Sequence, residues 1–398
     1  MSEMSYLEKL LDGVEVEWKA VGDIAGYSPT KVDADKLDAT SFVGVDNLLA
    51  DKGGRIDATY QPNTARLTAY EPGDILLGNI RPYLKKVWMA ENNGGCSGDV
   101  LAIRILADCK KIISPEYLYY ALSSDSFFSY SMQHAKGAKM PRGSKDAILN
   151  YQIPIPCPSA PEKSLAIQSE IVRILDKFTA LTAELTAELT AELTMRKKQY
   201  NYYRDQLLSF EGGSVEWKSL GEVAIITIGA FVRKDKQNPD ADYPVYNGGR
   251  TPTGYYEDFN NDGDKIIVSA RGANAGFVNK SSTPYWAGNS CYSISVRSTE
   301  QLHWMYVYYY LKQSETKLTG IQQKGGIPAV SKKQMEDLLL PIPSKSEQVR
   351  IVTILDKFDT LTSSITEGLP REIELRQKQY EYYRDLLFSF PKPDAVSH

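Results

Sequence analysis

Hydrophobic residues recur three and four positions apart along two stretches of the chain, residues 168–210 and 348–390. This spacing predicts two long amphipathic helices. Neither Gly nor Pro interrupts the first stretch, and a helix of that length would span about 65 Å and would need a partner for its apolar stripe. The second stretch contains Gly368-Leu369-Pro370, which predicts a bend or an interruption. The stripe of the first stretch consists of Ile171, Ile174, Leu175, Phe178, Leu181, Leu185 and Leu189.

The two stretches are copies of each other. They align without a gap at an offset of 180, and 24 of the 43 positions are identical. The similarity continues more weakly upstream, where VEVEWKAVGDIA at 14–25 matches SVEWKSLGEVA at 214–224. Pro-rich IPIPCPSAP and LPIPS separate each upstream segment from its helix. The chain is therefore two copies of one unit, each a globular segment followed by a helix. We expect the two long helices to pair with each other.

This organisation predicts an α+β fold with two globular domains, two long helices that pair antiparallel like a coiled coil, and a pseudo-twofold internal repeat. Residues 6–11 resemble residues 203–208, which precede the second VEW, so the repeat is cyclic. We expect residues 5–12 to form a short helix near the end of the second long helix, with the chain termini close in space. The expected segments are an N-terminal helix (1–13), a first domain (14–157), a central helix (158–213), a second domain (214–343) and a C-terminal helix (344–398).

Three consecutive TAEL tetrapeptides run from Thr182 to Leu193 within the first long helix. Ala, Glu and Leu are strong helix formers, so the plain interpretation is a regular spacer. Adding or removing one tetrapeptide would change the helix length by about 6 Å without breaking it, which would make the segment a ruler. The candidate spacer residues are Leu181, Leu185, Leu189 and Leu193.

Composition and motifs disfavour catalysis, export and membrane insertion. The net charge is −4, with 46 Lys and Arg against 50 Asp and Glu, which excludes a uniformly basic coat. The four cysteines are scattered, and no apolar run approaches the ~18 residues of a membrane span, so we expect a cytoplasmic protein. No GxxxxGK[ST], HExxH or GxSxG motif occurs, and His134, His303 and His398 lie far apart. We expect no catalytic residue, bound cofactor or metal in this chain.

Basic residues gather locally despite the acidic net charge. Each globular segment has two stretches without acids, 75–90 and 126–145 in the first and 265–299 and 316–335 in the second. This recurrence favours a confined phosphate-binding face over an ordinary solvated surface. Basic positions that both copies share are the candidate phosphate contacts, because the phosphates of DNA are the same for every base sequence. These positions are Arg81, Lys136, Lys145, Arg271, Lys324 and Lys332.

Unshared polar and aromatic positions in nearby loops are better candidates for reading bases in the major groove, where Arg, Asn and Gln are the usual readers. These are Arg55, Gln61, Asn63, Arg66, Asn79, Lys85, Lys139, Arg142, Asn247, Arg250, Tyr255, Tyr256 and Asn274. The tyrosines of 117–120 and 306–310 fit buried helix faces better than platforms for base stacking.

The tandem globular segments, the near-identical ILDKF…QYxYYRD helices and the TAEL run resemble the specificity subunit of type I restriction-modification systems, in particular the IC family. The resemblance covers the whole chain. It implies two target recognition domains that bind double-stranded DNA, two flanking DNA-methyltransferase subunits and two nuclease-translocase subunits. It also implies that catalysis, S-adenosylmethionine, ATP and Mg belong to those partners. Two other hypotheses stay open at this point: a helical scaffold or adaptor that does not bind DNA, and a self-contained methyltransferase.

Overall fold

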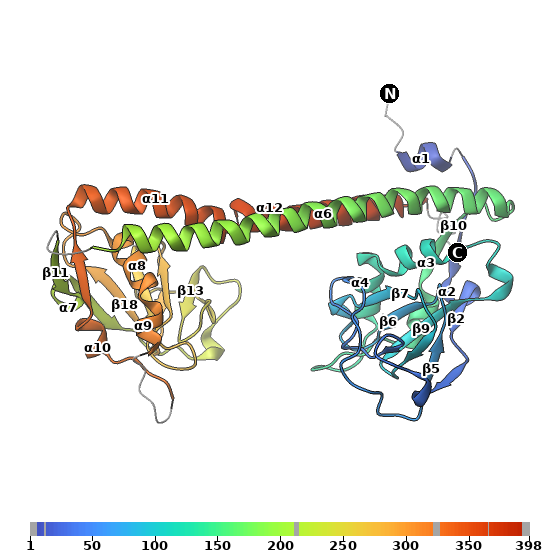
Figure 1. Cartoon of the computed structure of the whole chain (residues 1–398), viewed down its shortest axis with the longest axis horizontal. Coiled ribbons are helices and arrows are strands. Elements are labelled where there is room, and N and C mark those ends of the chain that lie inside the picture. The colour runs from blue at the N-terminus through green and yellow to red at the C-terminus, as the bar shows by residue number, and fades with distance from the viewer. Residues whose placement is uncertain (1–5, 12, 211–214, 321–326, 365, 392–398) are drawn as a thin grey trace. The chain divides into compact units, whose positions relative to one another are not determined.

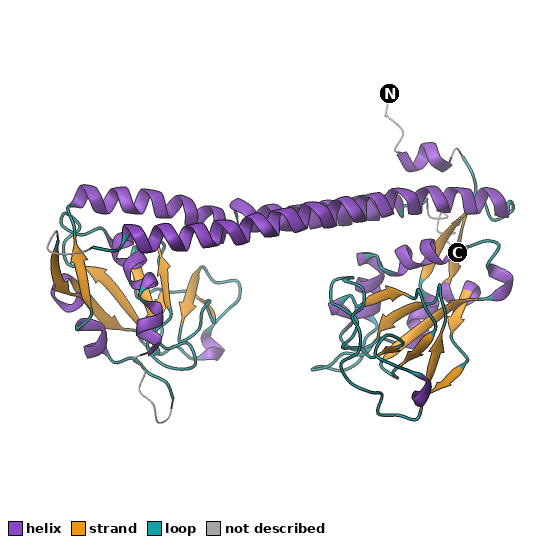
Figure 2. Cartoon of the chain, in the orientation of Figure 1, coloured by secondary structure: helices purple, strands orange, loops and turns teal. Residues whose placement is uncertain are grey.

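A computed structural model describes residues 6–11, 13–210, 215–320, 327–364 and 366–391. The chain forms two compact units (Figure 1). The first unit comprises Met1–Ala187 and Glu374–His398, and the second comprises Glu188–Ile373. Each unit contains one globular part and pieces of both long helices, and the secondary structure is a mixture of strands and helices, as expected for an α+β fold (Figure 2).

The first globular part is built from ten strands and several short helices. The strands are β1 (Val16–Ala20), β2 (Ala25–Tyr27), β3 (Lys31–Asp33), β4 (Phe42–Val43), β5 (Arg66–Tyr70), β6 (Ile75–Gly78), β7 (Val87–Met89), β8 (Gly94–Cys96), β9 (Val100–Ile105) and β10 (Gln152–Pro156). The helices are α2 (Val21–Ile24), η1 (Ala34–Lys36), η2 (Pro82–Leu84), η3 (Ala107–Cys109), α3 (Pro115–Leu122), α4 (Asp125–Gln133) and α5 (Lys145–Asn150). The strands form a ribbon of β1 and β10 and two sheets, ordered β2-β9-β6-β7 and β3-β5-β8-β4.

The second globular part has nine strands among its described residues. They are β11 (Glu216–Ser219), β12 (Ala224–Ile228), β13 (Tyr243–Tyr246), β14 (Gly254–Tyr256), β15 (Lys265–Ser269), β16 (Val278–Ser281), β17 (Trp286–Ala287), β18 (Cys291–Val296) and β19 (Leu339–Ile342). The helices are α7 (Leu220–Val223), η4 (Lys234–Lys236), α8 (Trp304–Gln313), α9 (Glu315–Gly320) and α10 (Lys332–Glu336). The strands form a ribbon of β11 and β19 and sheets ordered β12-β18-β15-β16 and β14-β13-β17.

The repeat is visible in the topology. The ribbon and the four-stranded sheet around β6 recur as the ribbon and the sheet around β15, with β6 antiparallel to β9 and β15 antiparallel to β18. The remaining sheet differs: it has four strands in the first unit and three in the second. The shared sheet is thus the common scaffold, and the other sheet is the part in which the two units diverge.

Strand β6 is buried along its whole length because each of its faces meets a different core. Ile75 and Leu77 pack in the core that also contains Tyr117 of α3, whereas Leu76 packs with Tyr70 of the second sheet. The same alternation divides β15 between two cores. A strand covered on both faces is apolar throughout, which explains why these runs show no polar alternation.

The long helices largely follow the sequence pattern. Helix α6 (Pro161–Leu207) is continuous over 47 residues, as predicted for the first stretch. The second stretch is interrupted, also as predicted, but the break lies just before Gly368: α11 (Lys345–Ser363) ends and α12 (Gly368–Leu387) begins there. Gly368 has a φ of +81°, and a Cβ at this position would lie 2.5 Å from the carbonyl oxygen of Thr360. Pro370 is tolerated because it falls in the first turn of α12.

The spacer leucines are only partly covered in this chain. Leu181 is 51% exposed, and Leu185, Leu189 and Leu193 are half-buried. In the part of the chain that the structure describes, none of the helices is both long enough and apolar enough to span a membrane.

The cyclic repeat is confirmed within the first unit. Helix α1 (Tyr6–Leu11) places Leu7 and Leu11 in the same core as Leu387 and Phe390 from the C-terminal region. The indole Nε1 of Trp18 also donates a hydrogen bond to the carbonyl oxygen of Pro391, at 2.9 Å. The described ends of the chain therefore lie together.

Candidate nucleic-acid interface

In the first unit, the two acid-free basic stretches form one surface. The loop after β6 runs beside the loop before α5, where the N–H of Arg81 donates to the carbonyl of Pro141 at 2.7 Å. The N–H of Gly143 donates to the carbonyl of Asn79 at 3.0 Å. Residues 60 positions apart in sequence are thus joined by backbone hydrogen bonds into one rigid, basic loop pair.

The second unit builds the same loop pair at the corresponding place. The N–H of Gly272 donates to the carbonyl of Pro328, and the N–H of Val330 donates to the carbonyl of Ala270, both at 2.9 Å. The loop after β15 is thereby fixed to the loop before α10. Below, "basic loop pair" means residues 79–86 with 136–145 in the first unit, and residues 270–277 with 327–332 in the second.

Arg81 and Arg271, the shared arginines, are exposed at the centre of these loop pairs. Among the described residues, neither guanidinium has an ion-pair partner, so both charges face solvent. Arg81 has a φ of 51°, which is the left-handed region and is uncommon for a residue with a side chain. The backbone bond to Pro141 holds it there.

The remaining shared lysines are placed consistently. Lys145 and Lys332 are the first residues of α5 and α10, which are capped by Ser144 and Ser331, and both lysines are exposed. Lys332 lies 3.6 Å from Glu336, a weak surface pair. Lys136 is exposed and its backbone bonds to Arg142 in both directions. Lys324 falls outside the described residues.

Three of the first unit's candidate base readers are partly or largely covered in this chain, and their role stays a prediction. Asn79 is only 8% exposed. The guanidinium of Arg55 lies over the Trp88 ring, 5.0 Å from its centroid, and its side chain is 16% exposed. Lys85 forms an ion pair with Asp125 at 2.8 Å. Loop sequence alone did not reveal that these side chains turn inward.

The other candidates of the first unit are exposed: Gln61, Asn63, Arg66, Lys139 and Arg142. Two of them have acidic neighbours in this chain, since Arg66 lies 3.5 Å from Asp33 and Arg142 pairs with Asp99. Such exposed pairs are weak, so both side chains can exchange a carboxylate for another acceptor.

In the second unit, three predicted base readers come together. Arg250 Nε donates to Oδ1 of Asn274 at 3.3 Å, and Nδ2 of Asn274 donates to the carbonyl of Gly248 at 3.4 Å. Asn247 lies on the same loop and donates to Thr253 at 3.0 Å. Tyr255 is 42% exposed, whereas Tyr256 packs edge-on against Trp286, with ring centroids 5.0 Å apart. The Arg250–Asn274 pair joins the diverged sheet to the basic loop pair.

Not every cation of the acid-free stretches faces solvent. Lys265 pairs with Asp262 at 2.6 Å, and Lys280 pairs with Asp359 of α11 at 2.8 Å. An acid-free stretch therefore overstates how many basic side chains face outward, because acids just outside the stretch or on other elements neutralise some of them.

The tyrosine-rich helices are buried, as expected, and they anchor each globular part to its long helix. Tyr120 donates to Asp176 of α6 at 2.6 Å, and Tyr309 donates to Asp356 of α11 at 2.6 Å. Burial, followed by the adjacent carboxylate, raises the pKa of both phenols far above the ordinary value. The aspartates belong to the ILDKF motif of each copy, so this anchor could have been inferred from the repeat.

An ionic cluster around one buried arginine of the first unit was not anticipated. Arg384 of α12 is 1% exposed and lies 3.4 Å from Asp125 of α4, which also accepts from Lys52 at 3.0 Å and from Lys85 at 2.8 Å. Glu381 pairs with both Lys52 and Arg384. Burial lowers the pKa of Lys52 to about 8. Burial raises the pKa of Asp125, but hydrogen bonds from the two lysines outweigh it and the net shift is downward.

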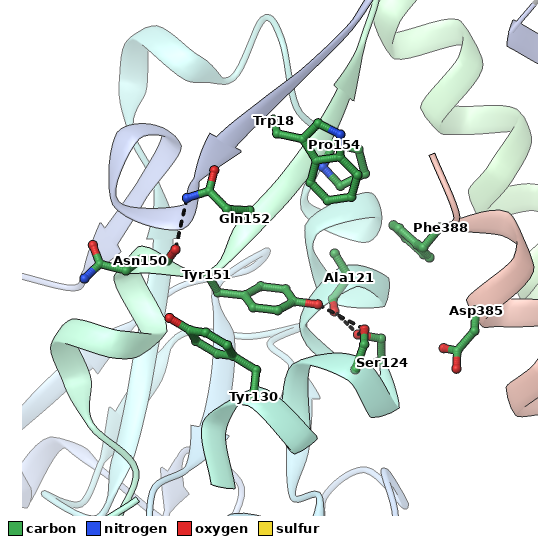
Figure 3. A pocket seen from close by; sticks show the side chains of 11 residues that line it. Trp18, Ala121, Ser124, Tyr130, Asn150, Tyr151, Gln152, Pro154, Asp385 and Phe388 are labelled. Carbon is green, nitrogen blue, oxygen red and sulfur yellow. Dashed lines mark hydrogen bonds between the residues drawn. The ribbon is translucent and has the colours of Figure 1, made fainter. Parts of the chain in front are cut away.

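A cavity of about 630 Å³ lies near this cluster, where the ribbon, α4 and the end of α12 meet. Figure 3 shows Trp18, Tyr130, Tyr151 and Phe388 around it. Its ionisable lining groups are the two phenols and the carboxyl of Asp385, whose pKa burial raises. Such a lining offers neither a nucleophile with a base nor a ligand set for a metal. No group of His, Cys, Asp and Glu suited to a metal ion occurs among the described residues.

Comparison with known proteins agrees with this geometry. The model of the type I restriction modification DNA specificity domain matches residues 72–195 and 214–375. The EcoR124I/EcoR124II specificity subunit of Escherichia coli is 41% identical, with both chains covered completely. The EcoprrI specificity subunit of Escherichia coli is 36% identical over 92% of this chain and 93% of the relative.

Solved structures show the same fold. A chain from a structural study of assembly and conformational transition in a type I restriction-modification system superposes with a TM-score of 0.63, at 21% identity and with 94% of this chain and 97% of that chain covered. The crystal structure of a type I S subunit from M. genitalium gives a TM-score of 0.50 at 15% identity, covering 98% of this chain and 100% of that one.

The chain belongs to the family of DNA specificity subunits of type I restriction-modification systems. Assignment to the IC family stays a prediction.

Proposed function

We propose that each unit reads one half of a split, asymmetric DNA target, and that the long helices set the distance between the halves and dock the methyltransferase subunits. Bound in this way, the chain directs adenine methylation or restriction by its partners. The observation that carries the proposal is the basic loop pair, which joins separate basic stretches into one exposed surface in each unit. A surface of this kind suits DNA phosphates.

Comparison of the two units indicates which parts contact phosphates and which read bases. The loop pairs lie on the shared sheet and carry Arg81 and Arg271, which suits contacts that are independent of sequence. The diverged sheets adjoin candidate base readers, such as Arg66 at the start of β5 in the first unit and Arg250 between β13 and β14 in the second. Because the two units share a scaffold but differ in the sheet beside the candidate base readers, we expect them to read two different half-sites.

The same reasoning assigns chemistry to the partners. We infer that this chain contributes no catalytic group. S-adenosylmethionine, ATP and Mg are then bound and used by its partners, two methyltransferase subunits and two restriction subunits, in the cytoplasm. The relatives' names support association with DNA and with other subunits of a restriction-modification complex. A scaffold without DNA binding is not favoured, because it gives no reason for the recurring basic loop pairs.

A titration of duplex DNA with the chain and its methyltransferase subunits tests the proposal. Fluorescence anisotropy at several salt concentrations should show affinity that falls steeply as salt rises. An adaptor that only gathers proteins would leave the affinity of the methyltransferase for DNA, and its salt dependence, unchanged when the chain is added.

A further inference from the structure

An exposed large aliphatic residue directly precedes the proline of each basic loop pair. Met140 directly precedes Pro141, and Ile327 directly precedes Pro328, so the two occupy the same place in the repeat. Met140 is 50% exposed and Ile327 is 76% exposed. Isolated exposed apolar residues are ordinary on a protein surface, but their recurrence at the same place in two otherwise diverged domains points to a shared role.

The backbone at each of these residues is constrained on the side of the proline. The proline that follows restricts each residue to extended conformations. In the first unit, Gly137 has a φ of +103° and closes the turn, and a Cβ there would lie 3.2 Å from the carbonyl oxygen of Met140. The carbonyls of Pro141 and Pro328 accept hydrogen bonds from the N–H groups of Arg81 and Gly272, in the loops that follow β6 and β15. Each aliphatic residue therefore directly precedes a proline that is tied to the shared sheet.

Their neighbours are cations. Lys139 precedes Met140 and is exposed, and Arg81 is bonded to the next residue of the loop. Arg271 takes the corresponding place in the second unit, where it pairs with Ala329 and precedes Gly272, the residue bonded to Pro328. An aliphatic side chain flanked by basic side chains matches DNA, in which stacked bases lie between two rows of phosphates. A site for a protein helix would instead present a continuous apolar groove.

We propose that Met140 and Ile327 are wedges that insert between neighbouring base pairs of their half-sites and unstack them. This inference rests on the proposed function and adds a positioning role to it. Aliphatic side chains act in this way in proteins that kink DNA. Burial of the exposed side chain offsets part of the cost of unstacking, while the adjacent arginine holds the flanking phosphate.

The test uses the full chain assembled with its methyltransferase subunits. Methylation sequencing first maps the target, and duplexes then carry the fluorescent base 2-aminopurine at successive half-site positions other than the methylated adenines, since a flipped adenine would itself brighten the probe. At saturating protein we expect increased fluorescence at one step in each half-site. Met140→Ala should abolish the increase in one half-site only, and Ile327→Ala in the other only.

Each variant should also weaken target binding by about tenfold, the order of magnitude for losing the burial of one such side chain, with an unchanged slope of affinity against salt. Leu106→Ala and Ile225→Ala are matched controls. Both side chains are exposed, at 44% and 45%, and lie at the opposite end of the shared sheet from the loop pair, so unstacking should persist.

Several results would overturn the wedge. One is a bound target with no brightened step, and another is brightening that survives both alanine variants. A third is weaker assembly with the methyltransferase in place of reduced unstacking, which would make these residues protein contacts. If the wild-type complex does not prefer the mapped duplex over a scrambled one, the proposed function itself fails.

Discussion

Phe178 of α6 stacks on Tyr383 of α12 in the first unit, with ring centroids 5.3 Å apart and ring planes inclined by 2°. In the second unit, Phe358 of α11 stacks on Tyr203 of α6 at 5.7 Å and 28°. The offset of 180 relates both partners of the two pairs. The same helix contact is thus made once in each unit, as an internal repeat with paired helices requires.

Removal of one TAEL tetrapeptide should shorten the unread spacer of the DNA target. Deletion of residues 186–189 shortens α6 by about 6 Å, whereas DNA rises by about 3.4 Å per base pair, so the spacer should change by one or two base pairs. Methylation sequencing of cells carrying the deletion variant measures this change. Altered half-sites at a constant spacing would refute the role of α6 as a ruler.

Arg81→Ala and Arg271→Ala should each weaken DNA binding equally for all sequences. Loss of one phosphate contact should reduce the slope of log affinity against log salt by about 0.9. Anisotropy titrations of the assembled complex on target and scrambled duplexes provide the measurement. Arg173→Ala, which removes an exposed arginine paired with Glu170 on α6, is the control of equal charge and should leave the slope unchanged.

A loss confined to one half-site sequence would instead identify Arg81 or Arg271 as a base reader. The distinction is informative because both arginines are shared by the repeat, whereas half-site sequences are expected to differ between the units.

Arg384→Ala should destabilise the junction between α4 and α12. The side chain is buried beside Asp125 and Glu381, and its removal leaves these carboxylates with lysine partners only, at a cost of about 2 kcal/mol. Hydrogen exchange followed by mass spectrometry should show faster exchange in α12 and α4.

The repeat supplies a matched control for this change. Arg204 occupies the corresponding position in α6 and pairs with Asp205, which is 54% exposed. Arg204→Ala should cost less than about 1 kcal/mol, because a solvated pair contributes little. Equal effects of the two substitutions would show that the ionic cluster adds nothing to the first unit.

Lys52 should make the stability of the first unit depend on pH. Burial lowers its pKa from 10.5 to about 8, so the unfolded chain binds more protons than the folded chain between these two values. The contribution of Lys52 to stability should therefore rise as the pH rises from about 8 to 10.5. Unfolding of wild type and Lys52→Met, compared at pH 8, 9 and 10, should show a growing difference in favour of the wild type.

A difference that stays constant or shrinks across this range would contradict the assigned shift. Lys36→Met, a change at a lysine whose side chain is 69% exposed, controls for the loss of one positive charge.

The sequence predicted those features that depend on periodicity and on the repeat. The continuity of α6, the interruption near Gly368 and the burial of Tyr117 and Tyr306 follow from local patterns. The basic loop pairs were predicted as separate stretches. Their joining by backbone hydrogen bonds, such as that from Arg81 to Pro141, depends on chain folding and could not be read from spacing.

Side chains that turn inward could not be predicted from the sequence. Arg55 looked like a base reader because its loop is polar, yet Trp88 from β7 covers it. The cluster around Arg384 joins residues from four distant segments. One signal was present: Glu381 replaces Asn201 within otherwise near-identical QYxYYRD motifs, which marks a contact made in the first unit only.

The central claim is that this chain selects a split DNA target through two different domains. Methylation sequencing of a host carrying the chain with its methyltransferase subunits tests it most directly. We expect methylated adenines within a target of two dissimilar half-sites and a fixed, unread spacer, and exchange of residues 14–157 for those of a relative should change one half-site alone. A single uninterrupted or palindromic target, or both half-sites changing together, would contradict the account.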